Sequence, residues 1–117
     1  MCPLTLCSLL DLAPIILGGG EASGPLYPPS NIALINEDMF SCGKACAKAY
    51  MAAGLQSSDM DYFGLYDCFP ICFVRALEGS GLAPPGGGGR LVQNWYEDKN
   101  AAMPLNTHGG LLGQGGM

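Results

Sequence analysis

Positive charge is scarce in this chain. Five lysine and arginine residues face ten aspartate and glutamate residues among 117 positions, and the formal net charge is −5 at pH 7. Nucleic acids and anionic membrane surfaces are bound by clustered cations, so the composition predicts no nucleic-acid and no membrane partner. The run from Pro3 to Gly18 lacks the basic start of a signal peptide and is too short and interrupted to span a bilayer. We therefore expect a cytoplasmic protein.

Metal ligands are also few. His108 is the only histidine. The six cysteines form three pairs separated by three or four residues: Cys2 and Cys7, Cys42 and Cys46, and Cys68 and Cys72. None of these spacings is the C-x2-C of structural zinc. In a reducing compartment we expect free thiols rather than disulfides, and thiols on a helix face favour a packing role. The sequence therefore predicts no metal site.

Disorder is not indicated for the middle of the chain, because 49% of all residues are hydrophobic. The length fits one domain or a piece of one. The 18 glycines and nine prolines cluster between apolar stretches and mark loops. The glycine-rich stretch 18–24 lacks the Lys-Ser/Thr of a phosphate-binding loop, so a turn is the better interpretation.

The apolar patterns predict alternating strands and helices. We expect buried strands at Pro14–Leu17 and Tyr62–Tyr66, and a further short strand at 90–93. A helix is predicted from Asn36 to Ala53, closed by a Gly54 cap, and a second from Pro70 to about Glu78. A glycine- and proline-rich loop is predicted at 79–89, and residues 94–104 are predicted to be irregular.

Two polar corners follow these elements. The first is Tyr66-Asp67-Cys68-Phe69, at the end of a predicted strand, and the second is the run 106–110 (NTHGG). In α/β proteins, side chains at the carboxyl ends of buried strands face the crevice where ligands bind. Each corner alone is a weak signal, and their order along the chain makes them stronger together.

From Pro14 onward the chain resembles the C-terminal domain of thiolase-like proteins, in the branch of sterol-carrier-protein thiolases and non-specific lipid-transfer proteins. The segments that carry the resemblance are PIILGGGE, MFSCGKACAKAYMAAGLQSSDMDYFGLYDCF, ALEGSGL and PLNTHGGLL. The resemblance implies an α/β fold with layered α/β/α architecture, present here as an incomplete C-terminal half-domain over 14–117, with residues 1–13 unassigned. It also implies a homodimer or hetero-oligomer for a full-length parent.

The resemblance also implies an acyl-CoA substrate, with coenzyme A as part of that substrate and no other bound cofactor. Family members carry Asn or His where this chain has Tyr66, and Tyr66 is accordingly the implied catalytic residue. The resemblance places the remaining implied residues around the substrate: Asp67, Asn106, His108, Gly109 and Gly110. The nucleophilic cysteine of thiolases lies in an N-terminal domain that this chain does not contain, and Cys68 is expected to pack rather than react.

The second corner departs from the family pattern, which continues as GG-x-x-S-x-G-H. Gly113 stands at the serine position, and Gly116 at the position of the catalytic histidine or tyrosine. Three hypotheses follow. The first is a fragment of an acyl-CoA C-acyltransferase of lipid metabolism, inactive alone. The second is a retro-aldolase for steroid or fatty acyl-CoA, motivated by Tyr66. The third is a non-catalytic binding or interaction module, motivated by Gly113 and Gly116.

Overall fold

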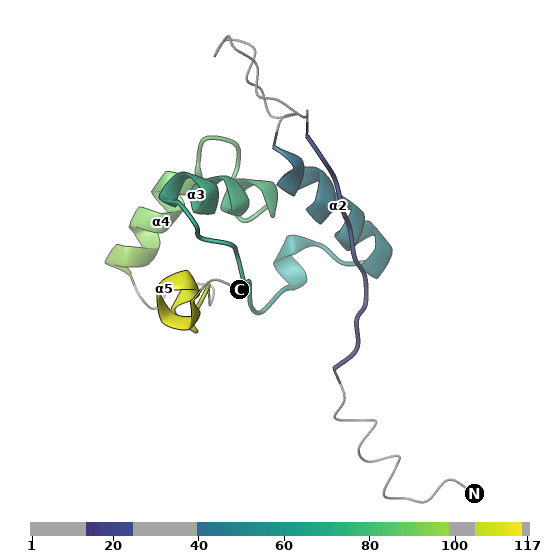
Figure 1. Cartoon of the computed structure of the whole chain (residues 1–117). Helices are drawn as coiled ribbons and strands as arrows, with labels where there is room; N and C mark the ends of the chain where they lie inside the picture. Colours follow the sequence, from purple (N-terminus) through teal and green to yellow (C-terminus); the bar gives the residue numbers. More distant parts are fainter. Residues whose placement is uncertain (1–13, 25–39, 99–104, 116–117) are drawn as a thin grey trace, which may run out of the picture.

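The computed structural model describes residues 14–24, 40–98 and 105–115. Its elements are α2 (Ser41–Ala53), the 3₁₀ helix η3 (Ser57–Asp59), α3 (Pro70–Gly79), α4 (Gly88–Glu97) and α5 (Gly110–Gln114). Figure 1 shows α4 starting beside α3, with the short α5 next to them and α2 on the other side of α3. Within the described part, no helix is long and apolar enough to cross a membrane.

Helix α2 confirms most of the first predicted helix. It begins at Ser41, five residues after the predicted cap at Asn36, because Phe40 is in an extended conformation with φ −96° and ψ 101°. Asn36 itself lies outside the described residues. The predicted C-terminal cap is confirmed: Gly54 has φ +69°, and the next amide, that of Leu55, donates to the Tyr50 carbonyl at 3.1 Å. This is the left-handed turn that glycine adopts without steric cost.

The predicted buried strand Pro14–Leu17 is wrong. The segment has no strand partner among the described residues, and the side chain of Ile16 is 91% exposed. The residues that follow instead run along α2 (Figure 1). A Cβ on Gly18 would lie 2.7 Å from the Ala49 carbonyl oxygen, and a Cβ on Gly20 would overlap the same helix backbone. The triple glycine therefore permits close packing against α2.

Helix α3 confirms the second predicted helix, with Pro70 in its first turn. Leu77 of α3 is fully buried and forms the core with Phe63 and Leu105. Ile71 of the same helix is 64% exposed, because it lies in the first turn where no described element covers it. The hydrophobic core is consequently small and centred on the C-terminal half of α3.

Helix α4 replaces the predicted strand at 90–93 and part of the predicted irregular segment. Leu91, Val92 and Trp95 recur at helical spacing and are each half-buried. In a strand, Leu91 and Val92 would point to opposite faces, and only one of them would be covered. Pro84, Pro85, Gly86 and Gly87 stay in the loop between α3 and α4, as predicted, whereas Gly79 belongs to α3 and Gly88 and Gly89 belong to α4. The strand prediction failed because a short apolar run fits both periods.

Three polar contacts connect Phe40, the residue before α2, with α3 and α4. The Arg75 guanidinium lies 4.1 Å from the centroid of the Phe40 ring and donates to Glu78 at 2.8 Å. The other oxygen of Glu78 accepts the Gly88 amide at 3.1 Å, at the first residue of α4. A carboxylate at this position satisfies a free N–H and the positive end of the helix dipole.

The predicted strand Tyr62–Tyr66 is reduced to one bridge. Phe63 forms an isolated parallel bridge with Leu105, and only Phe63 in the segment is fully buried. Tyr62 and Tyr66, on alternate positions, are 45% and 69% exposed. No regular strand occurs in the residues the structure describes, so the predicted layering is not observed here.

Candidate functional site

Asn106 joins the two polar corners predicted from the sequence. Its side-chain oxygen accepts the Leu65 amide at 2.8 Å, and its side-chain nitrogen donates to the Leu65 carbonyl at 2.8 Å. Its backbone amide donates to the Phe63 carbonyl at 3.1 Å. The carboxamide thus bonds the backbone of Leu65 as a neighbouring strand residue would, and it brings together two residues that are 41 positions apart in the sequence.

Asp67 adds a second connection. Its Oδ1 accepts the Leu111 amide at 3.0 Å in the first turn of α5, and its Oδ2 accepts the Asn106 side chain at 3.4 Å. Gly110 is buried directly against this carboxylate, with φ +59°, and a Cβ there would overlap the Asp67 side chain. Asn106 itself has φ +45°, a conformation that asparagine tolerates better than most residues. The junction therefore depends on residue types that accept left-handed backbone.

A groove of about 620 Å³ opens beside this junction. Four of the six predicted site residues line it: Asp67, Asn106, Gly109 and Gly110. The rest of its wall is mainly apolar and includes Cys68, Phe73, Trp95 and Leu112. Two predicted site residues, Tyr66 and His108, do not line this groove.

Tyr66 projects from the junction into solvent. Its side chain is 69% exposed although both of its neighbours, Leu65 and Asp67, are tied to Asn106. No other described residue hydrogen-bonds to its phenol. The backbone is thus fixed and the side chain is accessible, which leaves a phenol O–H able to donate to a ligand.

His108 has a partner that the sequence did not suggest. Its Nδ1 lies 2.7 Å from the Tyr62 hydroxyl, and both residues are exposed. Which of the two groups donates in this hydrogen bond depends on the imidazole tautomer of His108. The alternation Tyr62, Gly64, Tyr66 already placed both tyrosines on one side of the segment. Nothing in the sequence placed His108 beside them.

Two glycines, Gly113 and Gly116, depart from the family pattern, and only Gly113 lies within the described residues. At Gly113, a Cβ would lie 2.6 Å from the His108 carbonyl oxygen, so the serine of the family pattern would not fit this backbone. Gly116 lies outside the described residues.

The four described cysteines, Cys42, Cys46, Cys68 and Cys72, are free thiols. Burial, with a smaller contribution from the neighbouring Cys42, raises the pKa of Cys46 to about 11. Among the described residues, no three histidine, cysteine or acidic side chains gather as they would around a metal ion.

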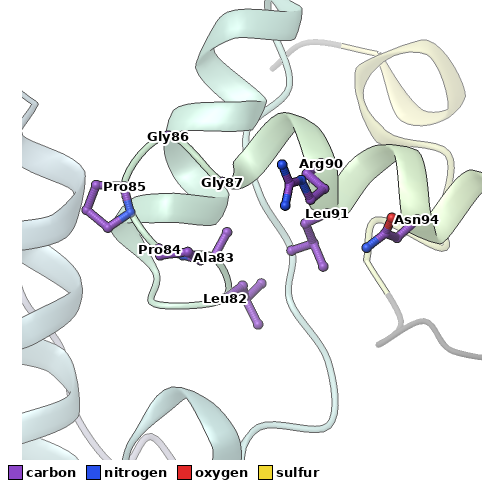
Figure 2. A pocket seen from close by; sticks show the side chains of 9 residues that line it. All are labelled: Leu82, Ala83, Pro84, Pro85, Gly86, Gly87, Arg90, Leu91 and Asn94. Carbon is purple, nitrogen blue, oxygen red and sulfur yellow. The ribbon is translucent and has the colours of Figure 1, made fainter.

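A second pocket lies away from the junction, between the Leu82–Gly87 loop and α4. It has a volume of about 420 Å³, and Figure 2 shows Arg90, Leu91 and Asn94 of α4 on one side of it. Arg90 supplies its one basic side chain, and the first amide of α4, on Gly88, is already bonded to Glu78. The Gly88 amide is therefore not free to bind an anionic ligand in this pocket.

Comparison with known proteins covers the part of the chain that contains both corners. Residues 34–117 match the family model described as thiolase C-terminal domain-like. The chain is 34% identical over 86 residues to Sterol carrier protein 2 of Bos taurus, covering 74% of this chain and 16% of that protein. It is 35% identical over 86 residues to the Rattus norvegicus protein, covering 74% of this chain and 15% of that protein.

An archaeal relative matches more of the chain. It is the Acetyl-CoA acetyltransferase of Methanothermobacter thermautotrophicus, 27% identical over 118 residues, with 98% of this chain and 30% of that protein covered. The chain thus spans less than a third of these relatives. The family match supports the α/β class inferred from the sequence. On this evidence, the chain belongs to the thiolase C-terminal domain-like family.

Proposed function

We propose that this chain is the part of a thiolase-like acyl-CoA C-acyltransferase that contributes the Tyr66 corner and the Asn106 loop to the acyl-CoA site. The observation that supports this most is the Asn106 junction, which unites the two corners through three side-chain hydrogen bonds. A site assembled from distant segments and ending in an accessible phenol is suited to hold a thioester.

The chemistry assigned to Tyr66 is donation of a hydrogen bond to the thioester oxygen as negative charge develops on it. Asp67 and Asn106 hold the backbone on both sides, so the phenol is positioned from a fixed base. Gly109 and Gly110 form part of the groove wall through their backbone, and His108 offers an exposed imidazole nearby. Coenzyme A enters as part of the substrate. The nucleophile of an acyl transfer is assigned to another part of a longer parent, which we expect to be a homodimer or a hetero-oligomer.

Tyr66 also supports a second function, a thiolase-like retro-aldolase for steroid or fatty acyl-CoA. A phenol at this corner can relay the proton of a β-hydroxyl group, whereas the amide of Asn cannot. The third alternative is a non-catalytic binding module. In that case the site binds acyl-CoA, and none of its side chains transfers a proton.

The proposal is tested by calorimetric titration of the 117-residue chain with acetyl-CoA, together with a thiolysis assay using acetoacetyl-CoA and coenzyme A. We expect weak binding that Tyr66→Phe reduces, no effect of the matched exposed variant Tyr96→Phe, and no turnover. Equal binding by wild type and Tyr66→Phe would remove Tyr66 from the site. Turnover by the isolated chain would refute the assignment of the nucleophile elsewhere.

A further inference from the structure

The groove beside the Asn106 junction has an apolar side to which the proposed function gives no role. Its side chains are Phe73 of α3, Trp95 of α4, and Leu111 and Leu112 of α5, which together are called the apolar wall below. The three helices lie next to one another in Figure 1. The groove therefore has a hydrocarbon and aromatic wall on one side and the polar junction on the other.

Much of the apolar wall is open to water. Trp95 is half-buried and Leu112 is fully exposed, and neither belongs to the described core around Leu77. An apolar ligand that covers such surface removes it from water, which is the main favourable contribution to binding in grooves of this kind. The groove volume of about 620 Å³ lies within the usual range for small-molecule sites.

The polar side chains of the groove already use their hydrogen bonds within the protein. Asp67 accepts the Leu111 amide and the Asn106 side chain. The Asn106 carboxamide is bonded to both backbone groups of Leu65. A polar ligand group that entered the groove would lose hydrogen bonds to water and regain few from these side chains. A hydrocarbon chain loses none.

The charge of the groove restricts its ligand further. Asp67 is the one acidic side chain among the described residues that line the groove, and no lysine, arginine or histidine is among them. A free fatty acid would bring its carboxylate towards Asp67, where like charges repel. The phosphates of coenzyme A would find no cation there either. An uncharged acyl thioester avoids both costs.

Tyr66 lies at the polar end of this arrangement. It directly precedes Asp67, and its exposed phenol stands outside the groove. A thioester bound at that phenol would lie at the mouth of the groove, so its acyl chain could follow the apolar wall while its coenzyme A portion points outwards.

We propose that the apolar wall binds the linear acyl chain of a medium- or long-chain acyl thioester, so that the site prefers such chains to acetyl. The inference rests on the proposed acyl-CoA function and adds the class of acyl group to it. Trp95 and Leu112 are the specificity-determining residues, and the nucleotide contributes little to the affinity of this chain.

The test titrates the 117-residue chain with acetyl, butyryl, hexanoyl and octanoyl thioesters of N-acetylcysteamine, which carry no nucleotide. Binding is followed by the fluorescence of Trp95, the only tryptophan. Full burial of one methylene raises affinity about fourfold, and an open groove covers a chain only in part, so we expect about twofold per methylene. The octanoyl thioester should thus bind about fiftyfold more tightly than the acetyl thioester. A bromine on its last carbon should quench Trp95, and coenzyme A and octanoate should not compete.

A matched pair of exposed variants locates the effect. Leu112→Ser removes part of the apolar wall without touching the core, so it should weaken octanoyl binding about threefold and leave acetyl binding unchanged. Met51→Ser, an exposed substitution on α2, should change neither. Circular dichroism checks that both variants retain their helices.

The outcomes separate this inference from the proposed function. Equal affinity for acetyl and octanoyl thioesters, equal binding of octanoate, or the same effect of Leu112→Ser and Met51→Ser would each overturn the role of the apolar wall. Acetyl-CoA binding that depends on Tyr66, without a chain-length effect, would overturn the inference and leave the proposed function standing. A chain-length effect that Tyr66→Phe does not alter would support the apolar wall and remove Tyr66 from the site.

Discussion

Replacement of Asn106 tests the junction on which the candidate site depends. In Asn106→Ala, the amide and carbonyl of Leu65 lose their partners in a half-buried position, which costs about 1 kcal/mol each. Alanine at φ +45° adds about 1–2 kcal/mol, since its Cβ disfavours left-handed backbone. We therefore expect a loss of roughly 3 kcal/mol in the free energy of unfolding. Asn106→Gly removes the conformational part and should lose roughly 2 kcal/mol.

Asn106→Asp keeps the shape of the side chain and removes its N–H donor, so it tests the hydrogen bonds alone. A carboxylate can still accept the Leu65 amide, but its second oxygen would face the Leu65 carbonyl and the carboxylate of Asp67. The pKa of the introduced acid should be higher in the folded state than in the unfolded state. Protonation of this acid therefore stabilises the folded protein below the unfolded-state pKa, and this stabilisation is lost as pH rises through the folded-state pKa. The variant should consequently recover stability between about pH 6 and pH 4 relative to Asn106→Ala.

The assay is urea unfolding followed by the fluorescence of Trp95, which is the only tryptophan and lines the groove next to Asn106. Asn94→Ala, an exposed substitution on α4, is the matched control and should stay within about 0.5 kcal/mol. If Asn106→Ala changes stability no more than this control, the junction is not what holds the two corners together.

Three further predictions concern single positions. Gly110→Ala should destabilise by more than about 2 kcal/mol, because its methyl group would overlap Asp67, whereas Gly89→Ala has open space and should be neutral or stabilising; urea unfolding of the pair decides this. Glu78→Gln should lose about 1–2 kcal/mol in the same assay, since it weakens both the ion pair and the α4 cap; an unchanged midpoint would contradict this. Alkylation of Cys46 by iodoacetamide, located by peptide mass mapping, should accelerate up to about pH 11, and a plateau near pH 9 would show that burial does not act on this thiol.

Local signals in the sequence predicted the helices best. Gly54 and Pro70 mark the end of α2 and the start of α3 through backbone preferences that do not depend on distant contacts. The strand predictions at 14–17 and 90–93 failed for a physical reason, because a short apolar run becomes a strand only when another strand pairs with it. Within the described residues, no such partner exists for either run.

In the candidate site, too, some features could be predicted from the sequence and others depend on distant contacts. The order of the two corners along the chain indicated that Tyr66, Asp67 and Asn106 belong together, and the hydrogen bonds of Asn106 agree with that grouping. The contact between Tyr62 and His108 could not be predicted, because it depends on how the loop after Leu105 turns back over the segment. The roles of these residues toward a substrate stay predictions.

The most direct test of the central claim is a map of amide chemical shifts of the 117-residue chain during titration with acetyl-CoA. The account predicts that the largest shifts fall on the Tyr66 corner and the loop 106–111, and that they shrink in the Tyr66→Phe variant. Shifts confined to the pocket beside α4 in Figure 2, or no shifts at all, would contradict the assignment of the acyl-CoA site to this junction.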